Sequence, residues 1–587
     1  MTQGRTDNSR PHPVSHVSWS LARLARVYPL PEAILHILLL VSAFNGLSQR
    51  AWTALCAEGH QVDIALADIG AEAIADTVAD LAPDLVICPF LKHRVPEKVW
   101  SAWPTVIVHP GPVGDRGPSS LDYAITDAEP LWGVTALQAV EEMDAGPIWA
   151  TRTFAMPENP VPKSALYNGP VADAAMECIA EVVEKALDPD FTPVPQEQTP
   201  RPVPHATTRP LLKRDERLFE WTLPAADIVR RIAAGDSTPG VRTELGGLVV
   251  HAYDAHLGGR TEGGAPPGTI VGKYEDAVAV AAGDGRMVWI GRLKHPKKEG
   301  GSGVKLSAAA VLGHVSAPRV EAPVSLREVE YERIGPVGLL TVRSHNGAMG
   351  TIQCRRILDA LDYALDQDTS VLVFKGTPEF FSNGIDLNAI EAAEDPAKEA
   401  WDNINAINDV CTALVTDTGQ LTIAAYTASA GAGGAMLGLA ADVALARDGV
   451  VLNPYYDIGL FGSELHTHTL PRRVGVELAG QLLDDKQPVD AAAALHLGLV
   501  DGVGPRDPAA FDEWIIEQAE LYASPENWRQ TYDAKLRFLT NSRPPAYYAA
   551  RELAEMAQDI FDDRSGFRAA RHAFVSKKPL QAAHAAR

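Results

Sequence analysis

The 587-residue chain carries 52 Lys and Arg against 75 Asp and Glu, which gives a net charge of −23. A chain of this length is too long to fold around one hydrophobic core, and at about 150 residues per domain it suggests three or four domains. The acidic balance argues against a broad surface for nucleic acid or an anionic membrane, although a local pocket can still bind phosphate. The five scattered cysteines lack metal-ligand spacing and indicate a reducing compartment, so we expect a cytoplasmic protein without a metal site.

The first 33 residues contain Pro, Ser and Arg without periodicity and predict a flexible leader. Residues 34–41 are apolar apart from His36, but the run is far shorter than the ~20 residues that cross a bilayer. Residues 42–45 lead directly into a helix-like stretch, without an export signal. The run therefore predicts the first buried strand.

Residues 34–200 alternate short apolar runs with amphipathic stretches, which predicts one domain. Apolar runs predict strands at 34–41, 62–66, 85–88 and 105–108. Amphipathic stretches predict helices at 47–58 and 72–81. This alternation indicates crossover connections and a mostly parallel sheet. Ligands gather beyond the carboxyl ends of such strands, so the residues after 85–88 and 105–108 are candidates for a site.

A Pro-rich stretch at 189–204 marks the boundary to a second domain, expected over residues 201–318. It begins with a helical pattern at 218–234. Short strand-like runs separated by Gly and Pro predict a small, OB-like β-barrel; they lie at 248–253, 269–271, 277–281 and 287–290.

A third domain is expected over residues 319–587, which makes the chain a multidomain α/β protein. Strands are predicted at 337–343, 370–374, 422–426 and 443–446. A helix is predicted at 349–366, and the tail after Trp528 has helical patterns throughout.

Two polar residues in the first domain suggest proton transfer. His109 follows the strand at 105–108, and Asp144 precedes a tight turn in the segment 144–148 (DAGPI). Alone, His109 could be a structural histidine and Asp144 a turn residue that caps its own backbone. Together at the strand exits of one sheet they could act as a pair, because histidine titrates near neutral pH and a carboxylate can fix its tautomer.

At these positions the chain resembles the folate-dependent formyltransferases, such as methionyl-tRNA formyltransferase, over residues 34 to about 310. The resemblance implies that His109 and Asp144 are catalytic and that 10-formyltetrahydrofolate is the one-carbon donor. It also implies a folate pocket lined by Asp144 together with Phe90, Leu91 and Lys92. Residues 212–240 resemble the start of the C-terminal barrel domain of the tRNA enzyme.

The chain departs from this family two residues before the histidine. The family has an asparagine there that polarises the formyl carbonyl, and this chain has Ile107. Loss of one oxyanion donor costs about 10²–10³ in rate in other enzymes. Either another donor replaces the amide, or the acceptor is a better nucleophile than an amine, such as a thiol.

In the third domain, residues 381–386 (FSNGID) and 429–434 (SAGAGG) place glycines directly after strands. Glycine lets the backbone approach a ligand, so that neighbouring N–H groups can point at one oxygen. Either motif alone could be a tight turn, but the pair resembles the enoyl-CoA hydratase/isomerase (crotonase) superfamily from residue 326 onward. The resemblance implies an oxyanion hole formed by the N–H groups of Ile385 and Gly433. The implied CoA-binding residues are Phe381, Asp386, Lys577 and Lys578.

Hydratases use two glutamates to handle water, and this chain has Met436 and Tyr455 at those positions. Methionine cannot transfer a proton, so we do not expect hydration. Tyr455 and Glu464 could form a different acid/base pair, with Tyr456 as the alternative tyrosine. The competing interpretation is that Tyr455 packs in the core and Glu464 is a solvated carboxylate at a helix start.

The two parts together, with residues 42–45, 108–123 and 462–464, resemble the HypX (HoxX) family of hydrogenase maturation factors. This resemblance implies formyl transfer from 10-formyltetrahydrofolate to coenzyme A, followed by release of carbon monoxide from formyl-CoA. Two alternatives stay open: a formyltransferase for another acceptor with an unrelated acyl-CoA domain, and a non-enzymatic assembly factor. Besides the small-molecule substrates, hydrogenase maturation proteins or the hydrogenase large-subunit precursor are candidate partners.

Overall fold

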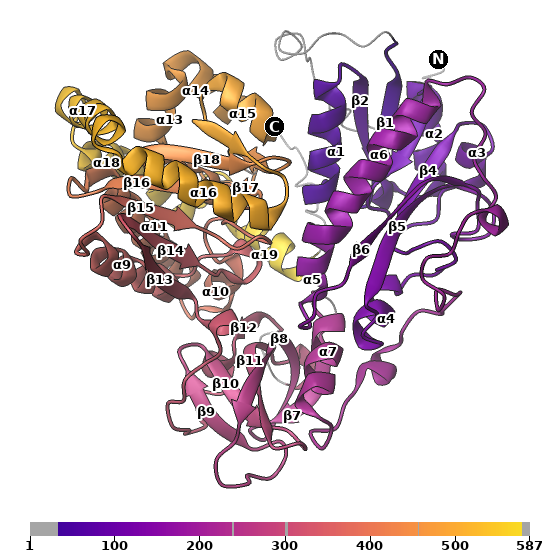
Figure 1. Cartoon of the computed structure of the whole chain (residues 1–587), viewed down its shortest axis with the longest axis horizontal. Helices are drawn as coiled ribbons and strands as arrows, with labels where there is room; N and C mark the ends of the chain where they lie inside the picture. Colours follow the sequence, from indigo (N-terminus) through magenta and orange to yellow (C-terminus); the bar gives the residue numbers. More distant parts are fainter. Residues whose placement is uncertain (1–32, 238–239, 300–302, 456, 578–587) are drawn as a thin grey trace, which may run out of the picture. The chain divides into compact units, whose positions relative to one another are not determined.

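The computed structural model describes residues 33–237, 240–299, 303–455 and 457–577 (Figure 1). The leader predicted at residues 1–33 lies outside this part, apart from its last residue. The chain divides into two compact units, each described by itself below. The first comprises Met1–Arg116, Gly133–Thr153 and Ala174–Thr208, and the second Gly117–Trp132, Phe154–Asp173 and Arg209–Arg587. The domain boundaries near residues 200 and 318 stay predictions.

The N-terminal sheet has the strand order β2-β1-β3-β4-β5-β6. The first four strands in this order are parallel, as predicted, and β5 joins β4 in the antiparallel direction. Their bounds are β1 His36–Val41, β2 Gln61–Leu66, β3 Leu85–Cys88, β4 Thr105–His109, β5 Leu131–Gln138 and β6 Ile148–Ala155. Residues 37–41 of β1 are all buried, which explains why this strand is a continuous apolar run.

The predicted helices of this part are confirmed within one residue at each end. Helix α1 spans Gly46–Ala57, and α2 spans Ala71–Leu81. Asn45 caps α1, because its side chain accepts the backbone N–H of Ser48. Helix α6, Ala172–Ala186, follows β6 along the chain.

The middle of the chain forms an antiparallel sheet with the order β7-β8-β11-β10-β9, and β12 pairs with β11. These strands are β7 Val241–Leu245, β8 Leu248–Arg260, β9 Ile270–Tyr274, β10 Ala277–Ala281, β11 Arg286–Lys294 and β12 Lys305–Ser307. Within the described residues β7 and β9 do not pair with each other, so closure of a barrel stays a prediction. The helix predicted at 218–234 is wrong in its first half. Helix α7 spans only Ala225–Ala234 because extended Pro224 stands at its N-cap.

The C-terminal part contains a six-stranded sheet with the order β13-β14-β15-β16-β18-β21. The hairpin β13–β14 is antiparallel and the other pairings are parallel. The strands are β13 Val329–Ile334, β14 Val337–Val342, β15 Val371–Lys375, β16 Leu421–Tyr426, β18 Val443–Arg447 and β21 Gly502–Gly504. A second sheet joins β17 Ala430–Gly431, β19 Val451–Asn453 and β20 Val489–Asp490.

Both faces of the six-stranded sheet are covered, which accounts for its apolar strands. On β15, Val371 and Val373 pack in a cluster with Phe511 of α16 (Pro508–Ala523). Helix α16 crosses β14, β15, β16 and β18 (Figure 1). The alternate residues Leu372 and Phe374 belong to the opposite cluster, which includes α9 (Thr351–Leu365) and α11 (Pro396–Thr416). The tail continues as α17 Pro525–Asn541, α18 Pro545–Phe561 and α19 Phe567–Ser576, as predicted.

Candidate active sites

The first site centres on His109, the last residue of β4. Its Nε2 atom lies 2.8 Å from Asp115 Oδ2, and its Nδ1 atom lies 3.6 Å from Asp144 Oδ2. All three side chains are buried, with 4–7% of their surface exposed. The structure therefore brings the predicted pair together. It also places Asp115, a residue that the sequence alone did not indicate, beside His109.

The turn after β4 is shaped around the contact between His109 and Asp115. A Cβ atom at Gly111 would lie 2.2 Å from Asp115 Oδ2 and 2.5 Å from His109 Nε2, so a larger residue there would have to displace these two side chains. Thr135 fixes this turn, because its hydroxyl donates to the carbonyl oxygen of Gly111 at 2.8 Å. The sequence offered one signal, the glycine directly after His109-Pro110.

Asp144 stands on a strained turn that a distant segment supports. Its φ of 55° lies in the left-handed region, which non-glycine residues rarely occupy. A Cβ at Gly146 would lie 1.9 Å from the carbonyl oxygen of Gln138. The buried amide of Gln196 donates to the carbonyl oxygens of Asp144 and Gly146, at 2.8 and 2.9 Å. Gln196 belongs to the Pro-rich stretch, so part of that stretch packs against the site.

The environment of His109 favours its charged form. Burial acts to lower the pKa of the imidazole, but the hydrogen bond with Asp115 and the charges of Asp144 and Asp115 outweigh it. The net result is a pKa raised above the ordinary histidine value. His109 can therefore serve as an acid or hydrogen-bond donor.

The predicted folate-lining residues follow β3, beside the end of β1. The N–H of Lys92 donates to the hydroxyl of Ser42, and the N–H of Ser42 donates to the carbonyl oxygen of Phe90, each at 2.8 Å. The ammonium of Lys92 lies 5.2 Å from the centre of the Phe90 ring. Leu91 and Ile107 pack against the hydrophobic cluster between the sheet and α2, so neither supplies a polar group.

The second site is a cavity of about 1180 Å³ within the second unit. It is large enough for a sizeable cofactor. Six of the predicted residues line it: Ile385, Asp386, Gly433, Tyr455, Glu464 and Lys577. The middle of the chain contributes Tyr253, Arg292, Lys294, Lys297 and Lys305 to the same lining. Anionic groups would therefore meet several cations.

The two glycine motifs meet at this cavity. A Cβ at Gly384 would lie 3.2 Å from the backbone nitrogen of Gly433, and the φ of Gly384 is +79°. A Cβ at Gly433 would lie 2.3 Å from Oε1 of Glu464. The carboxylate of Glu464 therefore lies against the backbone of the predicted oxyanion hole.

Tyr455 and Glu464 are in direct contact. The Tyr455 hydroxyl lies 3.0 Å from Glu464 Oε2 and 3.1 Å from the carbonyl oxygen of Ser463, and its single proton can be donated to either acceptor. Gly462 leaves room for the tyrosine, because a Cβ there would lie 2.5 Å from the ring. Burial raises the pKa of Glu464 and, together with the charge of Glu464, raises the pKa of Tyr455. Glu464 is 4% exposed and so is not a solvated helix-start carboxylate; Tyr456 lies outside the described residues.

Glu464 is held in place by residues that sequence reasoning missed. Its φ of 60° is left-handed, and its N–H donates to the side-chain oxygen of Asn408 at 2.8 Å. Glu552 of α18 accepts the N–H groups of Leu465 and Thr467 at 3.0 and 2.7 Å. Glu552 is fully buried, and desolvation raises its pKa to about 7 against these hydrogen bonds. No sequence motif marks it, because it lies on an ordinary amphipathic helix.

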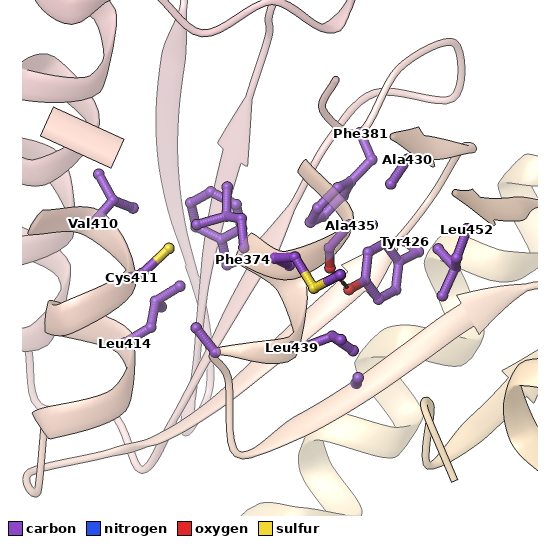
Figure 2. Packing of buried hydrophobic residues seen from close by; sticks show 14 of the residues in the cluster. Phe374, Phe381, Val410, Cys411, Leu414, Tyr426, Ala430, Ala435, Leu439 and Leu452 are labelled. Atoms are coloured by element: carbon purple, nitrogen blue, oxygen red, sulfur yellow. Dashed lines mark hydrogen bonds between the residues drawn. The ribbon is translucent and has the colours of Figure 1, made fainter. Parts of the chain in front are cut away.

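The predicted CoA-binding residue Phe381 is not among the residues that line the cavity. Its ring packs in the core, 4.6 Å from the ring of Tyr426 (Figure 2). Met436 is buried in the same cluster, so no acid occupies the hydratase position. Asp386 lines the cavity and also caps α10 (Leu387–Ala392) by accepting two backbone N–H groups. Lys578 lies outside the described residues.

Comparison with known proteins agrees with this architecture. Residues 340–582 match the enoyl-CoA hydratase/isomerase family, and residues 211–306 match the formyl transferase C-terminal domain. The chain is also 33% identical over 211 residues to a methionyl-tRNA formyltransferase of a Roseiflexus species, which covers 34% of this chain and 61% of that protein. Fold and sites thus define a protein that combines the formyltransferase and crotonase classes.

Two relatives match almost the whole chain. The hydrogenase maturation factor HoxX of Bradyrhizobium diazoefficiens is 36% identical over 552 residues, which covers 93% of this chain and 95% of the relative. The crystal structure of HypX from Aquifex aeolicus in complex with tetrahydrofolic acid superposes with a TM-score of 0.86 at 35% identity, covering 93% and 97% of the two chains. The chain belongs to the HoxX (HypX) family of hydrogenase maturation factors. Among the residues that the structure describes, no helix is long and apolar enough to span a membrane.

Proposed function

We propose that this protein makes carbon monoxide for the maturation of [NiFe]-hydrogenase. In the first step it transfers a formyl group from 10-formyltetrahydrofolate to coenzyme A, and in the second it splits formyl-CoA into CO and CoA. The family supports the hydrogenase context, and a 35% identical relative was crystallised with tetrahydrofolic acid. We place the protein in the cytoplasm, because its five cysteines are sparse for a chain of this length, odd in number and all buried.

In the first step, the CoA sulfur attacks the formyl carbon while Phe90, Leu91 and Lys92 hold the folate. The bond between the formyl carbon and the N10 nitrogen of the folate breaks, and this nitrogen receives a proton. The pair of His109, at the end of β4, and Asp144, in the turn before β6, handles that proton, because both side chains are buried and lie near each other. A thiolate is a stronger nucleophile than an amine at neutral pH, which makes the isoleucine at position 107 tolerable.

In the second step, the N–H groups of Ile385 and Gly433 hold the formyl oxygen. The pair of Tyr455 and Glu464 removes the proton from the formyl carbon as the carbon–sulfur bond breaks. The electrons of that bond go to sulfur, which takes up a proton to give CoA, and the electrons of the C–H bond complete the CO molecule. Burial raises the pKa of Glu464, which suits a group that both takes and returns a proton.

One observation carries the proposal: the contact of Tyr455 with Glu464 against the backbone of Gly433, with Met436 in place of the hydratase acid. This arrangement can move a proton beside a thioester carbonyl but has no glutamate pair to activate water. Water would convert formyl-CoA to formate, so a decarbonylase benefits from that lack.

The test is headspace detection of CO after the protein is mixed with 10-formyltetrahydrofolate and CoA, with His109→Ala and Glu464→Gln in parallel. We expect CO that depends on CoA and on both residues, and formyl-CoA that accumulates in Glu464→Gln. If formyl moves to another acceptor and no CO appears, the protein is a formyltransferase with a separate acyl-CoA domain. If hydrogenase maturation in cells survives His109→Ala unchanged, the protein is a non-enzymatic assembly factor.

A further inference from the structure

We infer that Asp115 is a positioning residue for formyl transfer: it holds His109 as an imidazolium whose Nδ1–H supplies the oxyanion donor that Ile107 lacks. This inference rests on the proposed formyl-transfer step, and it assigns a role to a residue outside the predicted His109–Asp144 pair. Asp115 does not touch the substrate and acts only through the ring of His109.

The two ring nitrogens of His109 have different partners. Nε2 is at hydrogen-bonding distance from Asp115, 2.8 Å. Nδ1 is 3.6 Å from Asp144, which is too long for a hydrogen bond. A substrate oxygen that enters beside Nδ1 can therefore take its proton as a hydrogen bond.

The protonation state decides what Nδ1 offers. A neutral imidazole has one N–H, and if Asp115 accepts it, Nδ1 carries only a lone pair and acts as a base. The imidazolium has two N–H groups, so Nδ1 becomes a donor while Nε2 stays bonded to Asp115. Among the described residues, Asp115 and Asp144 are the charged groups that act on the ring, and both raise the pKa of His109.

The backbone is adapted to this contact. Gly111 is the residue whose missing side chain makes room for both Asp115 Oδ2 and His109 Nε2. Asp115 itself is 4% exposed, so its carboxylate is placed against the ring and not in solvent. A buried carboxylate is costly unless it has a charged partner, and His109 is the partner that the structure gives it.

The chemistry that follows uses one proton. As sulfur attacks, negative charge develops on the formyl oxygen, and Nδ1–H stabilises it in place of the missing asparagine amide. When the bond to N10 of the folate breaks, the same proton moves from Nδ1 to that nitrogen. His109 is left neutral and is protonated again from solvent.

The test is the pH profile of tetrahydrofolate release by the full-length protein, with Asp115→Asn as the main variant. An enzyme that needs the imidazolium loses activity as the pH rises through the pKa of His109. Removal of the Asp115 charge lowers that pKa, so the alkaline limb should move to lower pH by about one unit or more. The rate at neutral pH should fall by up to about 10²-fold, the effect of losing an oxyanion donor.

Two further variants make the result decisive. Gly111→Ala pushes the pair apart and should shift the alkaline limb in the same direction, which covers the case that Asp115→Asn does not fold. Glu142→Gln removes a carboxylate with 75% side-chain exposure that does not face His109, and it should leave the profile unchanged.

Tetrahydrofolate is released whether the formyl group goes to CoA or to water. The pH profile can therefore be measured even if the protein makes no CO. The inference is overturned if the acid limb moves instead, because His109 is then a neutral base. It is equally overturned if Asp115→Asn leaves the profile of a folded, folate-binding protein unchanged.

Discussion

The buried carboxyl group of Glu552 should make the stability of the protein depend on pH. Its pKa is raised from 4.5 to about 7 in the folded state, so the folded protein binds this proton where the unfolded chain has already lost it. The free energy of unfolding therefore falls as the pH rises through this window. A shift of this size corresponds to about 3 kcal/mol, at about 1.4 kcal/mol per unit.

The variant Glu552→Gln isolates this contribution, because glutamine has the shape of the protonated acid and does not titrate. Urea unfolding of both proteins from pH 5 to pH 8.5 gives the difference between their free energies of unfolding. We expect the free energy of unfolding of the variant to rise relative to that of the wild type by up to about 3 kcal/mol across this range, largely between pH 5 and pH 7. A difference that stays constant with pH would refute the reasoning.

The same substitution should also affect the reaction. Glu552 accepts three hydrogen bonds: those of the Leu465 N–H, the Thr467 N–H and the Thr467 hydroxyl. A glutamine can accept them only with its single oxygen, so at least one buried donor loses its partner, at about 1–3 kcal/mol. Part of this cost falls on the left-handed turn that carries Glu464. We expect decarbonylation to fall by about tenfold, with formyl transfer unchanged.

Three further substitutions test the two sites. Gly433→Ala places a Cβ where the Glu464 carboxylate lies and should abolish CO release while tetrahydrofolate release continues, as measured by headspace and absorbance assays. Tyr455→Phe removes the hydroxyl that contacts Glu464 and should slow formyl-CoA breakdown by about 10²-fold in single-turnover experiments. An unchanged rate would exclude the tyrosine from proton transfer. Gln196→Ala removes two hydrogen bonds from the Asp144 turn and should destabilise the first unit by about 1–3 kcal/mol and slow formyl transfer; full activity would show that the turn holds itself.

The elements that the sequence predicts best are those that are buried along their whole length, because they form continuous apolar runs. Strand β1 is buried along residues 37–41, and β15 is covered on both faces, so each is a plain apolar run. The helix predicted at 218–234 is too long because the amphipathic pattern continues across Pro224. Proline has no backbone N–H and a fixed φ, so the helix begins after it, at Ala225. Periodicity records which side chains are buried and does not record where the backbone changes conformation.

Of the candidate site, sequence predicted the groups at strand exits and missed the groups that hold them. His109 and Glu464 stand beside recognisable glycines, whereas Gln196 is 52 residues away from Asp144 and Glu552 is 85 residues away from Thr467. Such contacts depend on how the chain returns to the site, which no local pattern contains. Phe381 is the opposite case: it occupies a recognisable motif position, but its side chain packs in the core beside the site and does not line the cavity.

Both sites share one physical arrangement despite their different folds. Asp144 and Glu464 are non-glycine residues with φ of 55° and 60°, a conformation that costs on the order of 1 kcal/mol or more each. Each strained turn is fixed by a buried side chain from a distant segment, Gln196 in the first case and Glu552 in the second. A carboxylate held in this way cannot swing into solvent when its partner group changes charge. That rigidity matters most for a proton that must leave one atom and return to another nearby, because a mobile carboxylate would exchange it with water.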